Sequence, residues 1–563
     1  MSPILVCLIA LGALLAGYLV YARFLEQRIF GLTDDEDVPS VRLRDDVDFA
    51  PTPRNILWGH HFASIAGAAP ILGPAMAIVW GWLPALLWIV VGVVFMGAAH
   101  DFGALVLSLR HEAKSVGALT QMFIGPRSRL LFLVVIFFLI WLVSAVFAFA
   151  IGGLFVKFPA SILPVNLEIV VAVGLGLWVY RYQRALFVPS LLALVGLYAV
   201  MFGTASDVLY VPGPESILRD LDFWLIALML YAFVASSLPV WVLLQPRDLI
   251  NSHQLVVGLV ALFAGFFVSS PTFHAPAVGP LEDLPALFPL LFVTVACGAI
   301  SGFHGLVSSG TTSKQLLHPR DARPIGYGAM LAEASLAILS TLAVATGMMV
   351  SGDDHVWHAV YEPIVAAKTL PEVPQALGGF VNGAATMLVA LGLEGQVAST
   401  IVAVLVISFA ATSLDTALRI QRLILGEIGE MFGWKALSNR WLAGTIACGS
   451  VLVLIYGDKA QGAKSLWPVF GATNQVFAAI TLLLCALYLR SNKRSAWPYL
   501  APAVVVMLLT FSAMAVQVLH DIAHGQWLVG TAGGVIAILT GWVALEGAFA
   551  WRRAGREGGD GTS

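Results

Sequence analysis

The 563-residue chain has few charged residues: Asp, Glu, Lys and Arg make up only 11% of it, whereas 59% of the residues are hydrophobic. A soluble chain carries about a quarter charged residues. This composition excludes an ordinary soluble protein and predicts an all-α protein that crosses the membrane many times. The formal net charge is −3 and no block of basic residues is present, so nucleic acid is excluded as a partner.

Several chemical motifs are also missing. The four cysteines, Cys7, Cys297, Cys448 and Cys485, lie inside apolar runs without paired spacing, which indicates small buried side chains rather than disulfides or metal ligands. There is no HExxH or CxxC motif and no G-x-x-x-x-G-K-[ST] loop, so self-contained ATP drive is excluded and no cofactor is predicted. The first apolar run lacks a basic start and a small-residue cleavage site, and it is interpreted as a retained helix.

Long apolar runs dominate what is there. A membrane-spanning helix needs about 20 apolar residues, and about fifteen runs meet this requirement. They lie at 3–22, 56–80, 84–109, 129–155, 165–180, 185–204, 222–245, 254–273, 287–312, 326–350, 396–418, 441–456, 466–489, 498–519 and 527–551. A further apolar segment, 377–393, is short and glycine-rich, and we expect a re-entrant or outer-surface helix there.

The distribution of positive charge orients these spans. Cytoplasmic loops carry the excess of Lys and Arg, and placing the amino terminus outside puts 25 of the 30 basic residues on the inner side. The outer side then receives five, which are Lys157, Arg219, Lys368, Lys459 and Lys464. We therefore expect a multi-pass protein with its N-terminus outside and its C-terminus inside.

Three segments contain residues that a plain lipid-facing helix avoids: GHHFASIAGAAPILGP at 59–74, ASSLPVWVLLQPRD at 235–248 and GAISGFHGLVSSGTTSK at 298–314. Proline removes a backbone donor and glycine loosens a helix, and the freed polar groups are tolerated only inside protein or beside a cavity. The alternative is that the small residues simply allow close helix packing.

We call the span at 56–80 helix 1, so that 222–245 is helix 6 and 287–312 is helix 8. Helices 1 and 6 are predicted to be interrupted at corresponding positions of two five-helix halves that cross the membrane in opposite directions. Paired broken helices in an inverted repeat predict a substrate site near the bilayer midplane, and the free N–H groups of half-helices suit a carboxylate. The predicted substrate-binding residues are Ser64, Gly67, Ala68, Ser236, Ser237, Ser301 and His304.

This repeat predicts four parts along the chain. They are an N-terminal peripheral helix and linker (1–55), a first repeat of the core (56–204), a second repeat with the re-entrant segment (205–425), and C-terminal peripheral helices (426–563).

Helix 8 also carries a hydroxyl cluster near its inner end. Together with freed carbonyl groups, these hydroxyls are suited to a sodium ion, although hydroxyls in membrane helices often bond their own backbone. The cluster consists of Ser308, Ser309, Thr311 and Thr312.

Ionisable residues inside a membrane are costly and need a partner or a role. His61, His100 and Asp101 are the predicted proton-coupling residues, because a carboxylate beside imidazoles can titrate near neutral pH. The alternative for Asp101 is a structural carboxylate bonded to a neighbouring helix. Glu333 in helix 9, the span at 326–350, is ambiguous from sequence.

Ionisable side chains in the spans also suggest a metal site and an ion pair. His60, His61, His100 and Asp101 could together bind zinc or another transition metal, although no motif spacing supports such a site. Asp415 precedes Arg419 by four residues, which predicts an ion pair within one helix.

The chain resembles the carbon starvation protein A family of inner-membrane transporters. The resemblance rests on GHHFASIAGAAPILGP, GAAHDF (97–102), LPVWVLLQPRD (238–248), ISGFHGLVSSGTTSKQL (300–316) and WPVFGATNQVFAAITL (467–482). That family is similar in plan to the amino acid–polyamine–cation superfamily, whose LeuT-type core is a five-plus-five inverted repeat. The resemblance implies a bacterial inner-membrane protein that takes up pyruvate or small peptides by secondary active transport, with protons as the coupling ion.

Two alternatives stay open. The first is a sodium-coupled symporter of another small carboxylate. The second is a metal-dependent integral membrane enzyme, which the chain's lack of any catalytic motif disfavours, so the chain is predicted not to be an enzyme. The lipid bilayer is the only other partner that the sequence predicts.

Overall fold

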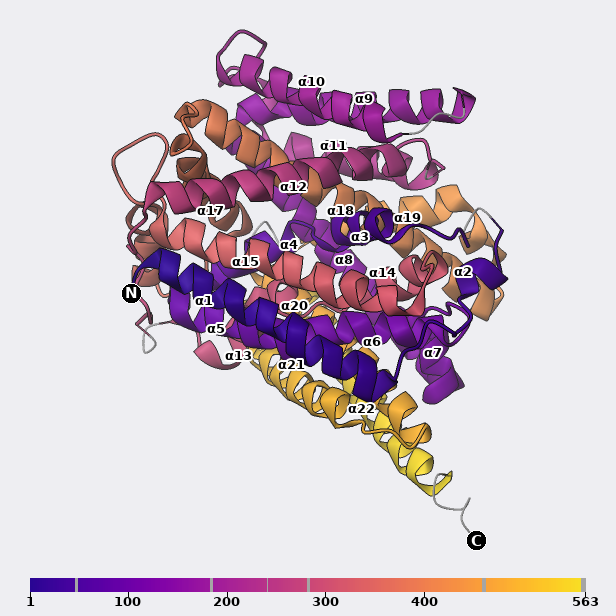
Figure 1. Cartoon of the computed structure of the whole chain (residues 1–563). Helices are drawn as coiled ribbons and strands as arrows, with labels where there is room; N and C mark the ends of the chain where they lie inside the picture. The colour runs from indigo at the N-terminus through magenta and orange to yellow at the C-terminus, as the bar shows by residue number, and fades with distance from the viewer. Residues whose placement is uncertain (46–48, 183–185, 240, 281–283, 458–461, 558–563) are drawn as a thin grey trace.

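The structure is a computed structural model of the whole chain, and it describes all residues except 46–48, 183–185, 240, 281–283, 458–461 and 558–563. The described residues form α-helices with short 3-10 and π-helical segments and contain no β-strand beyond two isolated bridges. The helices run roughly side by side, and the two termini lie at opposite ends of the bundle (Figure 1).

The N-terminal part is peripheral. Helix α1 (Pro3–Ala16) continues through the π-helical segments η1 (Gly17–Ala22) and η2 (Leu25–Phe30), and the short α2 (Pro39–Arg42) follows. The most apolar stretch of this span is only 28% buried, so most of its surface faces outward from the bundle.

The first broken span consists of α3 (Arg54–Ile65) and α4 (Ala69–Ala77), which η3 (Ile78–Trp80) extends. The two halves are bent by 48° at the break. Pro70 is the second residue of α4, where the missing N–H costs no helical hydrogen bond. The interruption predicted from the sequence of helix 1 is therefore confirmed.

The second broken span consists of α13 (Leu287–Val295), η7 (Ala296–Gly298), α14 (Phe303–Gly310) and η8 (Thr312–Lys314). Residues 299–302 are not helical. Ala296 has a φ of 43°, a left-handed conformation that a residue with a Cβ rarely adopts. The interruption predicted in helix 8 thus lies in the interior of the span.

The prediction that helix 6 is the broken partner of helix 1 is wrong. Helix α11 (Leu221–Ser237) ends before the interruption, and α12 (Leu244–Ser269) begins after it, so the predicted span at 222–245 consists of α11, a connection and the first residues of the next helix. Leu238 is extended, with ψ at 152°, because the residue before a proline disfavours helix. Pro246 falls in the first turn of α12, where proline is tolerated.

The remaining helices complete the bundle. They are α5 (Trp82–Gly92), η4 (Val93–Gly97), α6 (Ala98–Leu109), α7 (Val116–Phe123), α8 (Pro126–Lys157), η5 (Pro159–Ser161), α9 (Ile162–Tyr182), α10 (Phe187–Ala205), η6 (Ile217–Arg219), η9 (Pro319–Asp321), η10 (Arg323–Tyr327), α15 (Gly328–Thr346), η11 (Trp357–Tyr361), α16 (Glu362–Ala366), α17 (Val373–Val389), α18 (Gly395–Phe432), η12 (Lys435–Ser438), α19 (Arg440–Gly457), α20 (Gly462–Ser491), α21 (Trp497–Ala523) and α22 (Trp527–Glu557). Thirteen helical segments of the described chain are long and apolar enough to cross a membrane, the bent pair α3–α4 adds one, and α11 is a shorter apolar helix. Each of the fifteen predicted runs therefore coincides with a helix.

Helix α17 corresponds to the short apolar segment at 377–393. It is 17 residues long and largely buried. Its Gly383 packs against the end of α15, and Met387 packs against Gly265 near the end of α12. The segment is thus a buried helix across one end of the bundle, shorter than a full span.

The two broken spans pack against each other in antiparallel fashion. Helix α3 contacts α14, and α4 contacts α13. The helices that follow each broken span show the same reciprocal pattern. The second half of the first span, α4, contacts α15, and the second half of the second span, α14, contacts α6. Further contacts repeat in the same way: α8 with α11 and α18 with α19, and α3 with α12 and α13 with α20. These paired contacts indicate an inverted repeat with the two breaks at its centre, but they group α11 and α12 with the first half, whereas the sequence predicted that 205–425 is the second half.

Candidate functional site

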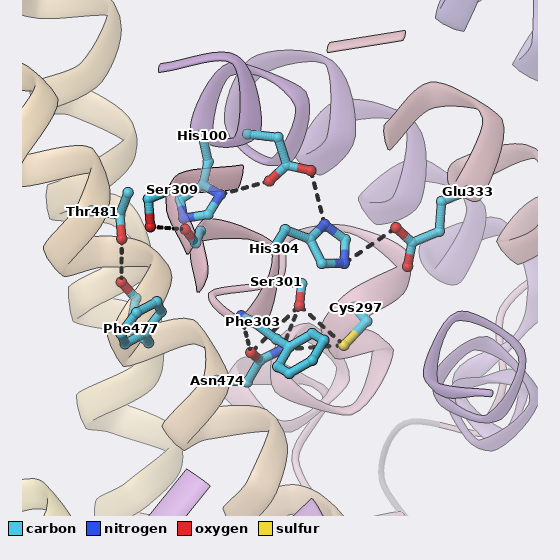
Figure 2. Close-up of polar contacts among 12 residues, drawn as sticks. His100, Cys297, Ser301, Phe303, His304, Ser309, Glu333, Asn474, Phe477 and Thr481 are labelled. Carbon is cyan, nitrogen blue, oxygen red and sulfur yellow. Dashed lines mark hydrogen bonds and ion pairs between the residues drawn. The ribbon is translucent and has the colours of Figure 1, made fainter. Parts of the chain in front are cut away.

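A chain of buried imidazole and carboxyl groups lies beside the second break. His100 Nδ1 is 2.7 Å from one carboxyl oxygen of Asp101, and His304 Nδ1 is 2.8 Å from the other. His304 Nε2 is 3.3 Å from Glu333 Oε2. All four side chains are at most 1% exposed, and Figure 2 shows His304 between the carboxyl group that His100 also contacts and Glu333.

Three different elements supply these groups. His100 and Asp101 lie at the start of α6, His304 is the second residue of α14, and Glu333 is in the second turn of α15. Consecutive residues on a helix point about 100° apart, yet both contact each other here because His100 folds its ring back onto the neighbouring carboxylate. These polar side chains thus connect α6, which follows the first broken span, with α14 and α15 inside an apolar core.

Several groups that can carry a proton meet here in a short chain of contacts. An ionised Asp101 accepts the Nδ1–H of both imidazoles, which leaves Nε2 of a neutral His304 as an acceptor. An ionised Glu333 is also only an acceptor, so His304 and Glu333 can hydrogen-bond only when one of them carries a proton. In this structure the two groups lie at an ion-pair distance of 3.3 Å, without hydrogen-bond geometry.

Asn474 of α20 supports the backbone at the second break. Its side-chain oxygen accepts from the Phe303 N–H at 3.0 Å, and its amide donates to the Ser301 hydroxyl at 3.2 Å. The Gly302 N–H donates to the Asn474 carbonyl. The freed backbone of this break is satisfied by a neighbouring helix, as buried backbone requires (Figure 2).

The first break, between α3 and α4, has fewer side-chain hydrogen bonds to its backbone than the second break among the described residues. Helix α4 begins after Ala68 without a side-chain cap, so its first N–H groups carry the positive end of the helix dipole into the core. Ser64 donates back to the His60 carbonyl. A Cβ on Gly67 would lie 2.6 Å from the Ser413 hydroxyl, which places α18 beside the break.

Comparison with known proteins identifies the family. A family model described as "Carbon starvation protein CstA" matches residues 2–513. The chain belongs to the CstA family. A relative in Escherichia coli (strain K12) named "Pyruvate/proton symporter BtsT" is 31% identical over 92% of this chain and 82% of its own length. Two named "Peptide transporter CstA", from E. coli (strain K12) and Bacillus subtilis (strain 168), are each 30% identical, over 89% and 86% of this chain and 79% and 85% of their own lengths.

Solved structures give weaker likenesses. A manganese transporter mutant from Eremococcus coleocola aligns with a TM-score of 0.44 at 13% identity, over 94% of this chain and 99% of that one. The transporter MhsT in complex with L-phenylalanine aligns with a TM-score of 0.43 at 13% identity, over 87% of this chain and 99% of that one. These scores are too low to carry an argument about this CstA-family chain.

Membership of the CstA family confirms the predicted transporter class, and with it the expectation that the chain is not an enzyme. The many apolar helices confirm a multi-pass membrane protein, and the relatives named above are bacterial.

The residues that the sequence grouped as possible metal ligands have different partners in the structure, and His100 contacts Asp101. His61 Nδ1 is 2.8 Å from the Thr312 hydroxyl, so it joins α3 to η8. His60, the preceding residue of α3, points about 100° away from His61 around the helix axis and is partly exposed. The described residues contain no group of three or more His, Cys, Asp or Glu side chains arranged for a metal ion. The metal alternative therefore gains no support from this CstA-family structure.

The hydroxyl cluster is largely used internally. Ser309 donates to the Gly305 carbonyl and accepts from the Val116 N–H, and Thr312 pairs with His61. Ser308 is fully buried, and within the described chain its hydroxyl has no partner. Thr311 is exposed at the end of α14.

Ser236 and Ser237 lie at the end of α11, and both donate back to the Phe233 carbonyl. Arg419 of α18 binds the same helix end by donating to the Ala235 and Leu238 carbonyls. The predicted Asp415–Arg419 ion pair within α18 is therefore wrong, because the arginine caps α11 instead.

Asp415 belongs to a second buried charge network that sequence reasoning missed. Arg247 Nη1 donates to Asp415 Oδ2 at 2.6 Å, and Arg247 Nε donates to Glu168 Oε1 at 3.2 Å. Tyr231 also donates to Asp415. The arginine, Glu168 and Asp415 are each 1% exposed. The signal available in the sequence was the unusual arginine directly after Pro246 in a quoted motif.

Proposed function

We propose that this protein is a secondary active transporter that takes up pyruvate or short peptides together with protons. The names of the relatives support both substrate classes, and one of them is called a proton symporter. The observation that carries the proposal is the 3.3 Å contact between His304 and Glu333, two buried groups that can each carry a proton, because it lies directly beside the second of two facing helix breaks.

The proposed substrate site lies between the two breaks. The uncapped start of α4 offers N–H groups to a carboxylate, next to Gly67 and Ala68, and Ser64 is one turn before. Ser301 and His304 face the second break. Ser236 and Ser237 stay proposed residues of the site's edge, where α11 meets α18.

The proposed proton pathway uses four groups in contact. Hydrogen bonds join His100 and His304 to Asp101, and Glu333 lies 3.3 Å from His304 Nε2. His61 approaches from α3, and its Nε2 is buried and unpaired within the described residues, as are His304 Nε2 and both Glu333 carboxyl oxygens. Protonating Glu333 removes a buried negative charge, which is the kind of change that couples ion binding to helix rearrangement. Glu333 thus joins the three residues predicted from the sequence.

Sodium coupling is the second candidate, and the buried, unpartnered Ser308 hydroxyl is the observation that favours it. A sodium ion needs several oxygen ligands, and the neighbouring Ser309 and Thr312 hydroxyls already have partners. Protons therefore remain the better-supported coupling ion.

Counterflow in proteoliposomes tests the substrate. Vesicles loaded with unlabelled pyruvate should draw in labelled pyruvate without any ion gradient, because exchange needs only the site and alternating access. Vesicles loaded with unlabelled tripeptide are assayed in the same way with labelled tripeptide. Exchange of neither compound would contradict the proposal, and exchange of one alone identifies the substrate class.

A further inference from the structure

A polar cavity of about 560 Å³ lies at the end of the bundle where the peripheral N-terminal span meets the start of the first broken span. Its walls come from η1, η2, α3, η9 and η10. Its charged lining residues are Arg23, Glu26, Arg54, Arg320, Asp321 and Arg323. The two breaks and the buried proton chain lie elsewhere in these spans.

Two of the arginines are held by carboxylates. Arg323 Nη1 donates to Glu26 Oε2 at 2.6 Å, and both side chains are at least three-quarters buried. The guanidinium also lies 5.4 Å from the ring centre of Tyr18. Arg320 pairs at 3.2 Å with Asp34, a residue outside the lining. These contacts shape the cavity wall.

The other two arginines are available. Arg54 is 59% exposed and only reaches Asp321 at 4.0 Å. Arg23 is exposed and makes no hydrogen bond or ion pair with any described residue. Two guanidinium groups from different elements thus face one cavity without a firm partner, an arrangement suited to an anion with several oxygens such as a phosphate.

Exposed apolar residues are close neighbours in the chain of the lining residues Tyr18, Arg23 and Asn55. Leu19 and Val20 of η1 are 57% and 70% exposed, Phe24 is 41% exposed, and Ile56 of α3 is 63% exposed. Trp58 lines the cavity itself, and tryptophan favours the boundary between hydrocarbon and headgroups. An anionic group held here would therefore sit beside a surface suited to acyl chains.

We propose that this cavity binds the phosphate group of an anionic phospholipid, with Arg23 and Arg54 as its principal ligands. The proposal does not depend on the transported substrate. Free phosphate offers the same oxygens, but it leaves the adjoining apolar face unused. A bound lipid would tie the peripheral span to α3, whose His61 lies two turns beyond Arg54, and so bears on the first broken helix.

The test uses the purified full chain in mild detergent and measures bound lipid by native mass spectrometry. Phosphatidylglycerol is titrated against phosphatidylcholine of the same chains. We expect preferential retention of phosphatidylglycerol, weakened about tenfold in the double variant Arg23→Gln/Arg54→Gln, because both charge-assisted contacts to the phosphate group are lost. Arg129→Gln is the matched control, since Arg129 is an exposed arginine outside the cavity with a single partner, Glu427.

Each outcome decides the proposal. Equal retention of the two lipids, or the same loss in Arg129→Gln as in the double variant, would overturn it. The single variant Arg23→Gln removes a side chain that has no hydrogen-bond or ion-pair partner among the described residues, so we expect it to keep the fold intact and still to weaken retention several-fold. Inorganic phosphate is the competing arm: full displacement of the lipid by millimolar phosphate would show a site for free phosphate and reject the lipid.

Discussion

His304 Nε2 and Glu333 Oε2 lie 3.3 Å apart inside the core, and a hydrogen bond between them forms only when one of the two groups carries a proton. The proposed coupling proton therefore belongs to a pair of residues on α14 and α15. Asp101 orients His304 from the other side by accepting its Nδ1–H. This division of roles assigns proton exchange to Glu333 and positioning to Asp101.

Replacing the carboxyl group tests that division. Glu333→Gln keeps the shape and can still bond His304, but it cannot release a proton. We expect counterflow of substrate to persist while accumulation driven by a pH gradient is lost. Both are measured in the same proteoliposomes. Glu362→Gln, at a 64% exposed carboxylate, should leave both unchanged, and accumulation by Glu333→Gln at the wild-type level would reject the assignment.

The buried Arg247 network makes a prediction about stability. Arg247→Leu leaves Glu168 and Asp415 in the core without their cation. Breaking a buried ion pair from one side costs about 3–5 kcal/mol, so we expect a clearly lower unfolding temperature in detergent. Adding Glu168→Gln and Asp415→Asn should recover part of the loss.

The control for this change is Arg42→Leu, because Arg42 is half-exposed and its pair with Glu112 lies at the surface. Surface pairs contribute little, so its unfolding temperature should stay near that of the wild type. Similar losses in the two variants would contradict the role given to burial.

At the scale of elements, the breaks explain where proline and glycine are needed. Gly97 of η4 and Gly302 both face backbone across the second break: a Cβ on either would lie 2.4 Å from a carbonyl oxygen, of Ala299 and Asn474 respectively. The small residues here serve both expected purposes, since they interrupt a helix and allow neighbouring backbones to approach closely.

A single methyl group tests this packing. Gly302→Ala forces the break away from α20, and overpacking of this kind costs about 1–3 kcal/mol. We expect a lower unfolding temperature and slower uptake. Gly310→Ala is the matched control on α14, since a Cβ there meets nothing within 4 Å. Equal behaviour of the two variants would show that the close approach is unimportant.

Sequence predicted the existence of these elements better than their pairing. Length and apolar character located every span, because a membrane imposes both on a helix. A proline pair at the junction of α11 and α12 looked the same as a mid-membrane break, since Pro239 and Pro246 carry no information about depth. Glu333 stayed ambiguous because its partner, His304, comes from a different helix, and such contacts depend on packing.

For the whole molecule, the repeated contacts suggest different domain limits from those expected. We propose that the second five-helix unit begins at α13 and ends with α20. The α9–α10 pair then forms a peripheral hairpin outside the first unit. This agrees with its position at the edge of the bundle (Figure 1). The division of the sequence at 205 missed this because an inserted hairpin shifts the helix count by two.

Orientation is the second prediction at this scale. The charge distribution places the N-terminus outside and the C-terminus inside, and the two termini do lie at opposite ends of the bundle (Figure 1). A green fluorescent protein fused to the C-terminus should fluoresce in a bacterial host, because it folds only in the cytoplasm. Alkaline phosphatase fused there should be inactive, and the reverse pattern would contradict the proposed inner-membrane topology.

The central claim is that substrate and proton cross together, and the most direct measurement is substrate-driven proton flux. Proteoliposomes with a pH dye inside, and no initial pH gradient, are given an outside excess of the substrate that counterflow identifies. The account predicts acidification of the interior in the wild type, with no acidification in Glu333→Gln although substrate still exchanges. Substrate uptake by the wild type without any change of internal pH would contradict it.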